Sequence, residues 1–341
     1  MRPRSSNEGA DANDDGAPAV VADPIKVRLS PVEETMVLTL WSRARDAASA
    51  RPVLGDAHAQ RILDRVDADS FSPTLFPRDP RYHNYITVRA KQLDEWCRDF
   101  LRQHAREPVA VLHLACGLDL RALRLRPACG DGGVLWIDLD KPDIADLRRR
   151  LIPDPTAEEE EGKGDDDDED DEGKGEDRRG GNGSGSRGEW DYRLIGASVS
   201  DDSWLDEIPH DRPLLVVAEG LFPYLAAEEA TALLRRLVKH ADGGGGGGTI
   251  VMDTVGTILT RYHALMPLFR GTGVRMRWGV DDGEDVARAH PRLALAETVL
   301  FRDLLPGLFA SAAPPCLGPL TPLFSLLPSW RTYGQLLRLE F

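Results

Sequence analysis

Three acidic residues stand at the ends of apolar runs that have the length of buried strands. The run "WIDLD" (136–140) carries Asp138 and Asp140, and "LLVVAEG" (214–220) places Glu219 after five apolar residues. A carboxylate at the end of a buried strand is costly unless it has a partner. Such acids can accept ribose hydroxyls or face a cationic ligand group. The alternatives are a helix cap for one of the aspartates and a structural ion pair for Glu219.

The stretch "VAVLHLACGLDLRALRL" (109–125) predicts a strand, a tight turn at Ala115, Cys116 and Gly117, and a helix. Small side chains in the turn let backbone N–H groups approach a ligand. The glycine spacing is not G-x-G-x-x-G, so we do not expect a dinucleotide pyrophosphate. A ligand with an adenosine, a positive centre and no phosphate matches this turn and the acids above, and S-adenosylmethionine has that description.

Alternating strands and helices position these residues. Apolar runs at 133–140, 190–198, 213–220 and 248–254 alternate with helical patterns at 142–151 and 226–240. This alternation predicts a doubly wound, mostly parallel α/β sheet. Ligands bind such sheets outside the carboxyl ends of the strands, where all the acids named above would lie. The C-terminal "WRTYGQLLRLEF" predicts a last strand, and antiparallel edge strands are common in such sheets.

The N-terminal part has a different pattern. Residues 1–24 are polar and are expected to form a disordered tail, and residues 25–107 predict a helical cover. Its first helix begins at "SPVEETM", where Ser30, Pro31 and Glu33 stand at capping-box and first-turn positions. Further helices are predicted at about 56–67 and 84–104. The α/β domain would then occupy residues 108–341.

The charge of −15 is concentrated in one segment. Residues 158–177 hold fourteen Asp and Glu against two Lys, so the rest of the chain carries about −3. We read residues 155–189 as an acidic, glycine-rich disordered insertion; the alternative is a docking tail for a basic partner. The remainder gives no reason to expect nucleic-acid or membrane binding, and no obligate protein partner is evident.

The chain has no apolar run of membrane-spanning length, and its N-terminus lacks the apolar core of a signal peptide. Its four cysteines have no CxxC spacing, which argues against a zinc site and favours reduced thiols. We therefore predict a cytoplasmic protein without a metal.

Seven motifs occur in the order expected for one family. They are "LSPVEETM" (29–36), "VRAKQLDEWCRDFL" (88–101), "LHLACGLDLRALRL" (112–125), "WIDLDKPDI" (136–144), "LLVVAEGLFPYL" (214–225), "RMRWGVDD" (275–282) and "YGQLLRLEF" (333–341). On these motifs and their order, the sequence resembles the leucine carboxyl methyltransferase superfamily, and within it the polyketide O-methyltransferase branch of the tetracenomycin-synthesis type.

This resemblance implies a seven-stranded, Rossmann-like methyltransferase fold with S-adenosylmethionine as cofactor and a substrate-side insertion at 255–330. Carried over by position, Arg89 resembles the residue that holds the carboxylate of the donor, which suits a guanidinium. Gly117 resembles the close-approach glycine, Asp140 the ribose acid, and Glu219 the acid beside the donor.

The adenine position departs from the family pattern. Relatives that act on proteins have Asp-Leu beside the adenine, where this chain has Ser198 and Val199. Ser198 could hydrogen-bond the adenine amino group, or Asp201 or Asp202 could supply the acid instead.

The acceptor determines what further chemistry is needed. A carboxylate is ionised at neutral pH, whereas a phenol benefits from a base. Tyr224 is the catalytic candidate, as a group lining the acceptor pocket, with a core aromatic as the alternative. Arg277 and Trp278 could hold an acidic or aromatic acceptor, although Trp278 could equally belong to the core. No histidine is assigned a catalytic role, and His113 is expected to be packed in the strand layer.

The sequence therefore predicts an S-adenosylmethionine-dependent O-methyltransferase for carboxyl or phenolic groups of a small, polyketide-like molecule. One alternative is methyl esterification of a protein C-terminus, against which the departure at Ser198 counts. Another is a regulatory protein that binds the donor without turnover. An NAD dehydrogenase is disfavoured because the phosphate-binding glycines are missing.

Overall fold

The computed structural model describes residues 24–67, 80–152, 155–156, 190–242, 244, 246–265, 273–304 and 331–341. The expected tail at 1–24 and acidic insertion at 155–189 lie outside these residues, apart from residues 24, 155 and 156. Within the described ranges, no helix combines the length and apolarity that crossing a bilayer requires.

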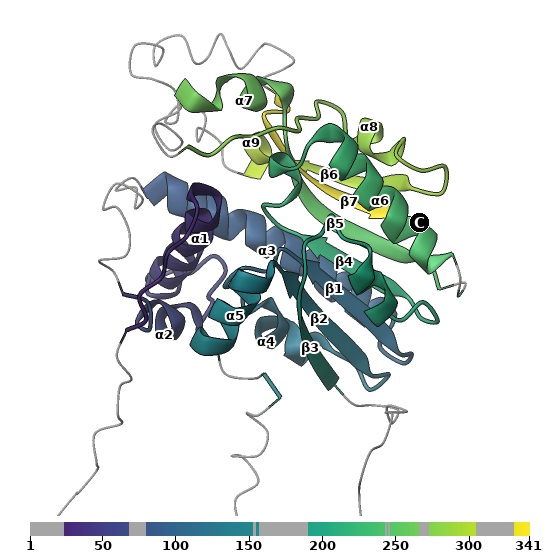
Figure 1. The fold of residues 1–341 in the computed structure, drawn as a ribbon, viewed down its shortest axis with the longest axis horizontal. Helices are drawn as coiled ribbons and strands as arrows, with labels where there is room; N and C mark the ends of the chain where they lie inside the picture. The colour runs from purple at the N-terminus through teal and green to yellow at the C-terminus, as the bar shows by residue number, and fades with distance from the viewer. Residues whose placement is uncertain are drawn as a thin grey trace, which may run out of the picture.

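Seven strands form one sheet in the order β3-β2-β1-β4-β5-β7-β6 (Figure 1). Neighbours from β3 to β5 pair in parallel, and β7 pairs antiparallel with β5 and β6. The predicted doubly wound, mostly parallel fold is confirmed. The strands are β1 (Val109–Leu114), β2 (Val134–Asp140), β3 (Trp190–Gly196), β4 (Leu214–Ala218), β5 (Gly248–Val255), β6 (Ala294–Leu300) and β7 (Gly334–Glu340).

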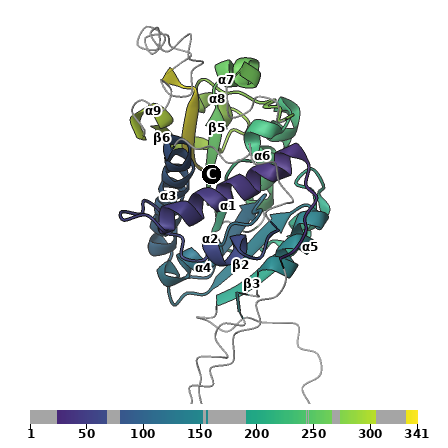
Figure 2. The same ribbon diagram turned by 90° about the vertical axis from the view of Figure 1, so that its left-hand side faces the viewer.

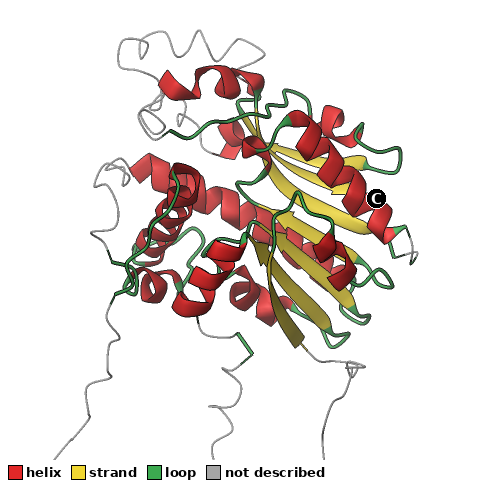
Figure 3. Cartoon of the chain, in the orientation of Figure 1, coloured by secondary structure: helices red, strands yellow, loops and turns green. Residues whose placement is uncertain are grey.

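Helices cover both faces of the sheet (Figure 3). They are α1 (Pro31–Ala47), α2 (Ala59–Leu63), α3 (Pro80–Gln103), α4 (Arg121–Leu125), α5 (Pro142–Leu151), α6 (Ala227–Ala241), α7 (Thr257–Tyr262), α8 (Gly283–Ala287) and α9 (Phe301–Leu304). The helix predicted at 56–67 is shorter than expected, because after Leu63 the chain turns and Val66 makes a bridge with Ile25.

Side chains of β1 alternate between the two hydrophobic cores, one on each face of the sheet. Ala110, Leu112 and Leu114 pack in the core that also contains the apolar residues of α6, whereas Val109 and Val111 pack in the core built on α3. Successive side chains of a strand point to opposite faces, so one apolar run serves both cores. The buried central strands thus fix where their carboxyl ends lie.

The first helix lies across those carboxyl ends (Figure 2). Its predicted start is confirmed: Ser30 Oγ accepts from the Glu33 N–H at 3.4 Å, and Glu33 Oε2 accepts from the Ser30 N–H at 2.8 Å. This capping box satisfies two N–H groups at the end of the helix. The helix that covers the strand ends therefore has a defined beginning.

The C-terminal strand was predicted, but it does not lie at the edge of the sheet. β7 lies between β5 and β6, and the edge is β6, within the range 255–330 that we expected to be an insertion. Most residues of β6 are exposed or half-buried, and its register shifts between Leu295 and Glu297. An edge strand that faces solvent has a weak apolar alternation, which is why the sequence did not indicate it.

Candidate functional site

A cavity of about 500 Å³ opens at the carboxyl ends of the parallel strands, beneath α1. Residues of α1 and α3 line it, together with the end of β5, the turns that follow β1 to β4, and Met276 and Arg277. It contains all but one of the site residues predicted from the sequence, namely Arg89, Gly117, Asp140, Ser198, Val199, Glu219, Tyr224 and Arg277. The exception is Trp278, which packs against Phe222 and the core beneath α6 instead.

The turn after β1 has two residues in left-handed conformation, Ala115 at φ +50° and Gly117 at φ +51°. For an alanine this conformation costs about 1–2 kcal/mol. A Cβ at position 117 would lie 3.2 Å from Met36 Cβ of α1, so the glycine also lets the cover approach. The Gly117 N–H donates to Asp140 Oδ2 at 2.7 Å. The turn therefore brings the backbone, the cover and Asp140 together at the cavity wall.

Asp140 is held by two backbone donors, one to each oxygen. Besides the bond from Gly117, its Oδ1 accepts from the Lys141 N–H at 2.8 Å. Each carboxylate oxygen has a second lone pair, so Asp140 can also accept from two hydroxyls in the cavity. Burial raises the pKa of this carboxyl despite the bonds from Gly117 and Lys141.

Asp138, the other acid of this motif, has a structural role. It is fully buried and does not line the cavity. Its oxygens are engaged by Trp136 Nε1 at 2.9 Å, His113 Nδ1 at 3.1 Å, the Tyr192 hydroxyl at 2.8 Å and the Arg148 guanidinium. Of the two aspartates that the sequence left open, only Asp140 lines the cavity.

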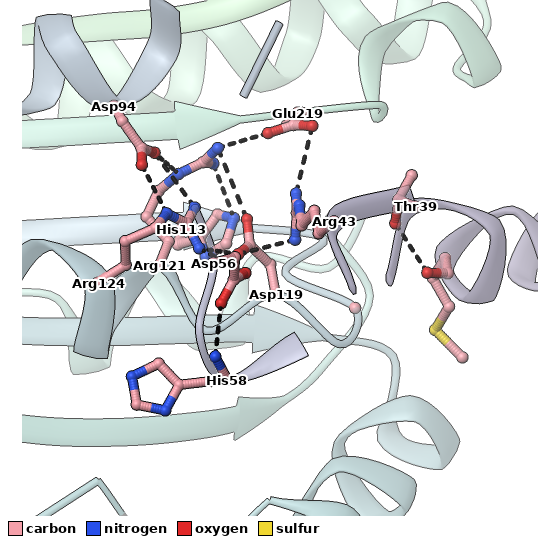
Figure 4. A network of polar contacts seen from close by, with 12 residues as sticks. Thr39, Arg43, Asp56, His58, Asp94, His113, Asp119, Arg121, Arg124 and Glu219 are labelled. Carbon is pink, nitrogen blue, oxygen red and sulfur yellow. Dashed lines mark hydrogen bonds and ion pairs between the residues drawn. The ribbon is translucent and has the colours of Figure 1, made fainter. Parts of the chain in front are cut away.

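Glu219 belongs to a buried ion-pair network, in which Figure 4 shows it beside Arg43 and Arg121. Its Oε1 accepts from Arg89 Nη2 at 2.9 Å and lies 3.4 Å from Arg43 Nη2, and its Oε2 accepts from Arg121. Burial alone would raise the pKa of Glu219, but Arg89, Arg121 and Arg43 hold it well below its usual range. The structural ion pair considered for Glu219 is thus present, and the same carboxylate lines the cavity.

The network continues away from the cavity through α3 and α4. Arg121 Nε donates to Asp94 at 2.7 Å, and Arg124 Nε donates to the same carboxylate at 2.6 Å. Arg124 also reaches Asp56 and Asp119, and Arg43 of α1 lies 2.8 Å from Asp119. These side chains are nearly inaccessible to solvent. The network therefore fastens α1 to the strand ends through charges that are costly to separate.

Arg89 connects this network to the other side of the cavity. Its Nη1 donates to Asp253 Oδ2 at 3.1 Å, and its guanidinium carbon lies 5.5 Å from the centre of the Tyr85 ring. With the two bonds to Glu219, contacts to the described residues use three of its five N–H donors. Two donors remain for a carboxylate in the cavity, which fits the role that the resemblance implies.

The segment after β3 supplies another wall. Ser198, Val199 and Ser200 line the cavity, and Ser198 Oγ accepts from the Ser200 N–H at 3.2 Å. Asp201 and Asp202 do not line the cavity, and the Asp202 carboxylate pairs with Arg236. The structure therefore does not place either aspartate as the adenine acid, and Ser198 keeps that candidate role.

Tyr224, Arg277 and His113 also line the cavity. Tyr224 belongs to a short 3-10 helix (Phe222–Tyr224), and burial raises the pKa of its hydroxyl. Arg277 is half-exposed and pairs with Glu229 at 3.2 Å. His113 is 1% exposed, with its ring nitrogens 3.1 Å from Asp138 and 3.4 Å from Arg121. The expected packed position of His113 in the strand layer is confirmed, and this residue also lines the cavity.

Two site residues were missed, and each carried a readable signal. Arg43 follows Met36 and Leu40 along the apolar stripe of α1, where a charge needs a buried partner. Asp253 ends the apolar run "TIVM" of β5, as Glu219 ends that of β4. The rule applied to the first, second and fourth strands would have identified Asp253 in the fifth.

Comparison with known proteins gives consistent results. The family model described as leucine carboxyl methyltransferase matches residues 10–238. The tetracenomycin polyketide synthesis O-methyltransferase TcmP of Streptomyces glaucescens is 36% identical over 271 residues, covering 80% of this chain and 83% of the relative. The S-adenosyl-L-methionine-dependent methyltransferase dpfgK of Gibberella zeae is 35% identical over 284 residues, covering 81% and 84%.

A DUF574 family protein of Streptomyces avermitilis represents the solved structures. It is 9% identical, with a TM-score of 0.49, and the alignment covers 89% of this chain and 96% of the other. This similarity is too low to support an inference, so the two sequence relatives and the family model carry the comparison.

Proposed function

Because this chain belongs to the leucine carboxyl methyltransferase family, we propose that it methylates a carboxyl or phenolic oxygen of a small, polyketide-like molecule. It is a methyltransferase that uses S-adenosylmethionine, the cofactor named for the Gibberella zeae relative. The observation that carries the proposal is the cavity at the strand ends, which is lined by the anchored carboxylate of Asp140 and the partly engaged guanidinium of Arg89 and has no phosphate-binding glycines.

We assign the adenosine end of the donor to Asp140, Ser198 and Val199, and its carboxylate end to Arg89. Asp140 has lone pairs for the ribose hydroxyls, and Ser198 and Val199 lie on the wall where the adenine would rest. Arg89 has two N–H donors for the carboxylate of the donor. Gly117 lines the cavity beside Asp140, and its lack of a side chain lets Met36 of α1 approach this turn.

When bound, S-adenosylmethionine supplies a methyl group activated by a sulfonium. The protein orients the reacting groups and excludes water from them. Helix α1 serves both purposes because it covers the strand ends where the cavity lies. Burial raises the pKa of Tyr224 and of Tyr85, which keeps both phenols protonated at neutral pH. Among the acidic residues that line the described cavity, Glu219 and Asp119 form ion pairs with arginines.

These surroundings favour a carboxyl acceptor over a phenol. A carboxylate is already ionised at neutral pH and needs no base, whereas a phenol benefits from one. Of the groups that line the cavity, Asp253 is paired with Arg89, and His113 is hydrogen-bonded to Asp138. Apolar side chains of Met36, Leu225, Val255 and Met276 line the cavity and suit an apolar ring system. Arg277 at its rim can attract an acidic acceptor, and Tyr224 can pack against it.

Calorimetric titration separates this function from the dinucleotide alternative. We expect the wild-type protein to bind S-adenosylmethionine and its demethylated product, S-adenosylhomocysteine, and to give no heat with NAD. The reason is that the turn at Gly117 has no glycines to cradle a pyrophosphate. Heat with NAD and none with either sulfur ligand would contradict the proposal.

A further inference from the structure

The segment Ser198–Asp202, which we call the β3 loop, has little support of its own. It follows β3, which is an edge strand and pairs only with β2. Within the loop, Asp201 N–H donates to the Ser198 carbonyl at 3.0 Å, and Ser200 N–H donates to Ser198 Oγ at 3.2 Å. These two bonds close a turn but do not attach it to the rest of the fold. The loop nevertheless carries two residues of the cavity wall.

Val199 packs against the core, and among the described residues one side chain from another element makes several polar contacts with the loop. Arg236 lies on α6 and does not line the cavity. Its Nη2 donates to the Val199 carbonyl at 2.6 Å, and its Nη1 lies 3.1 Å from the Ser200 carbonyl and 3.0 Å from the Asp201 carbonyl. Nη1 also pairs with the Asp202 carboxylate. A single guanidinium thus contacts four consecutive residues of the loop.

The chemistry of these contacts suits a clamp. A guanidinium is planar and always charged, so its N–H groups can bind several oxygens in a fixed geometry that an ammonium cannot reproduce. The side chain of Arg236 is 21% exposed, which limits competition from water. Because a carbonyl and its neighbouring Cα atoms share one peptide plane, fixing the Val199 carbonyl also fixes the orientation of the wall residue.

We propose that Arg236 is a positioning residue for donor binding: it clamps the β3 loop so that Ser198 and Val199 form the adenine wall of the cavity. This inference rests on the proposed function, because it concerns the adenosine half of the same donor. Arg236 itself touches neither donor nor acceptor. It acts from behind the wall, through the backbone of Val199, Ser200 and Asp201.

The neighbouring residue provides a matched control. Arg235 lies on the same helix and donates from Nε to the Ala289 carbonyl at 2.8 Å, away from the β3 loop. We expect Arg236→Gln to raise the dissociation constant of S-adenosylhomocysteine about tenfold, the effect of losing charged hydrogen bonds that order the site. Arg235→Gln should keep the wild-type constant. Arg236→Lys, which keeps the positive charge but not the planar guanidinium, should give a dissociation constant between those of wild type and Arg236→Gln.

Hydrogen exchange supplies a readout that a general loss of stability would not imitate. In Arg236→Gln, amides of residues 198–202 should exchange faster than in the wild type, while those of β1 and β4 keep their protection. Equal affinity for S-adenosylhomocysteine in Arg236→Gln and wild type, or unchanged exchange in the loop, would overturn the clamp alone. Failure of the wild-type protein to bind this probe would overturn the proposed function and the clamp with it.

Discussion

Replacing Glu219 with glutamine should lower the free energy of unfolding at pH 7 by about 3 kcal/mol, the lower end of the range for breaking a buried ion pair. The carboxylate faces Arg43, Arg89 and Arg121, and each of these guanidiniums would then lose one charged partner. The lower end applies because each arginine keeps an aspartate partner. Urea unfolding followed by circular dichroism measures this difference.

The same substitution should change the dependence of stability on pH. The folded-state pKa of Glu219 is well below its usual value of 4.5, so its contribution is complete above that pH and is lost as the pH falls toward the folded-state pKa. The difference between wild type and Glu219→Gln should therefore shrink by about 1.4 kcal/mol for each pH unit below 4.5. A difference that stays constant from pH 7 to pH 3 would show that Glu219 is not an ionised partner of these arginines.

Glu229 is the matched control for this experiment. It pairs with Arg277 at the surface, where both side chains are about half-exposed. Glu229→Gln should cost less than about 1 kcal/mol, because solvent screens such a pair. Similar losses for the two substitutions would contradict the role of burial in the Glu219 network.

Replacing Arg89 with methionine should weaken binding of S-adenosylmethionine by at least about 100-fold. Two charge-assisted hydrogen bonds to the carboxylate of the donor would be lost, each worth about 1.5–3 kcal/mol. Titration calorimetry measures the change in dissociation constant. Arg89→Lys keeps the positive charge between Glu219 and Asp253 but not the planar fork, so it should restore only part of the affinity.

Arg102 serves as the control on the same helix. It is largely exposed and pairs with Asp99 within α3. Arg102→Met should leave the affinity for the donor unchanged. If a folded Arg89→Met protein bound the donor within threefold of wild type, the carboxylate site would have to be elsewhere in the cavity.

Local pattern was sufficient to predict the central sheet, because buried parallel strands are continuous apolar runs. The runs that became β1, β2, β4 and β5 end in the turns that line the cavity. The edge strand β6 was missed because solvent-facing residues such as Glu297 interrupt its pattern. Local sequence also could not indicate that β7 inserts between β5 and β6, since the order of strands is a long-range property.

The site was predictable wherever a polar residue interrupts or ends an apolar pattern. This rule singled out Asp138, Asp140 and Glu219, and the resemblance to the family contributed Arg89. Pairings between elements distant in sequence were not predictable: Arg43 and Glu219 are 176 residues apart. Local pattern alone also did not distinguish Asp138 from Asp140 as the acid that lines the cavity. The difference lies in partners such as Arg148, which forms an ion pair with the buried Asp138.

Transfer of labelled methyl groups tests the central claim most directly. The purified protein would be incubated with S-adenosylmethionine labelled in the methyl group and an extract of cells that carry the gene, and the products separated into small molecules and protein. We predict label in small molecules, dependent on the added protein and released as methanol by mild base, as a carboxyl methyl ester requires. Base-stable label would indicate a phenol ether instead. Label in protein alone, or no transfer, would contradict small-molecule O-methylation.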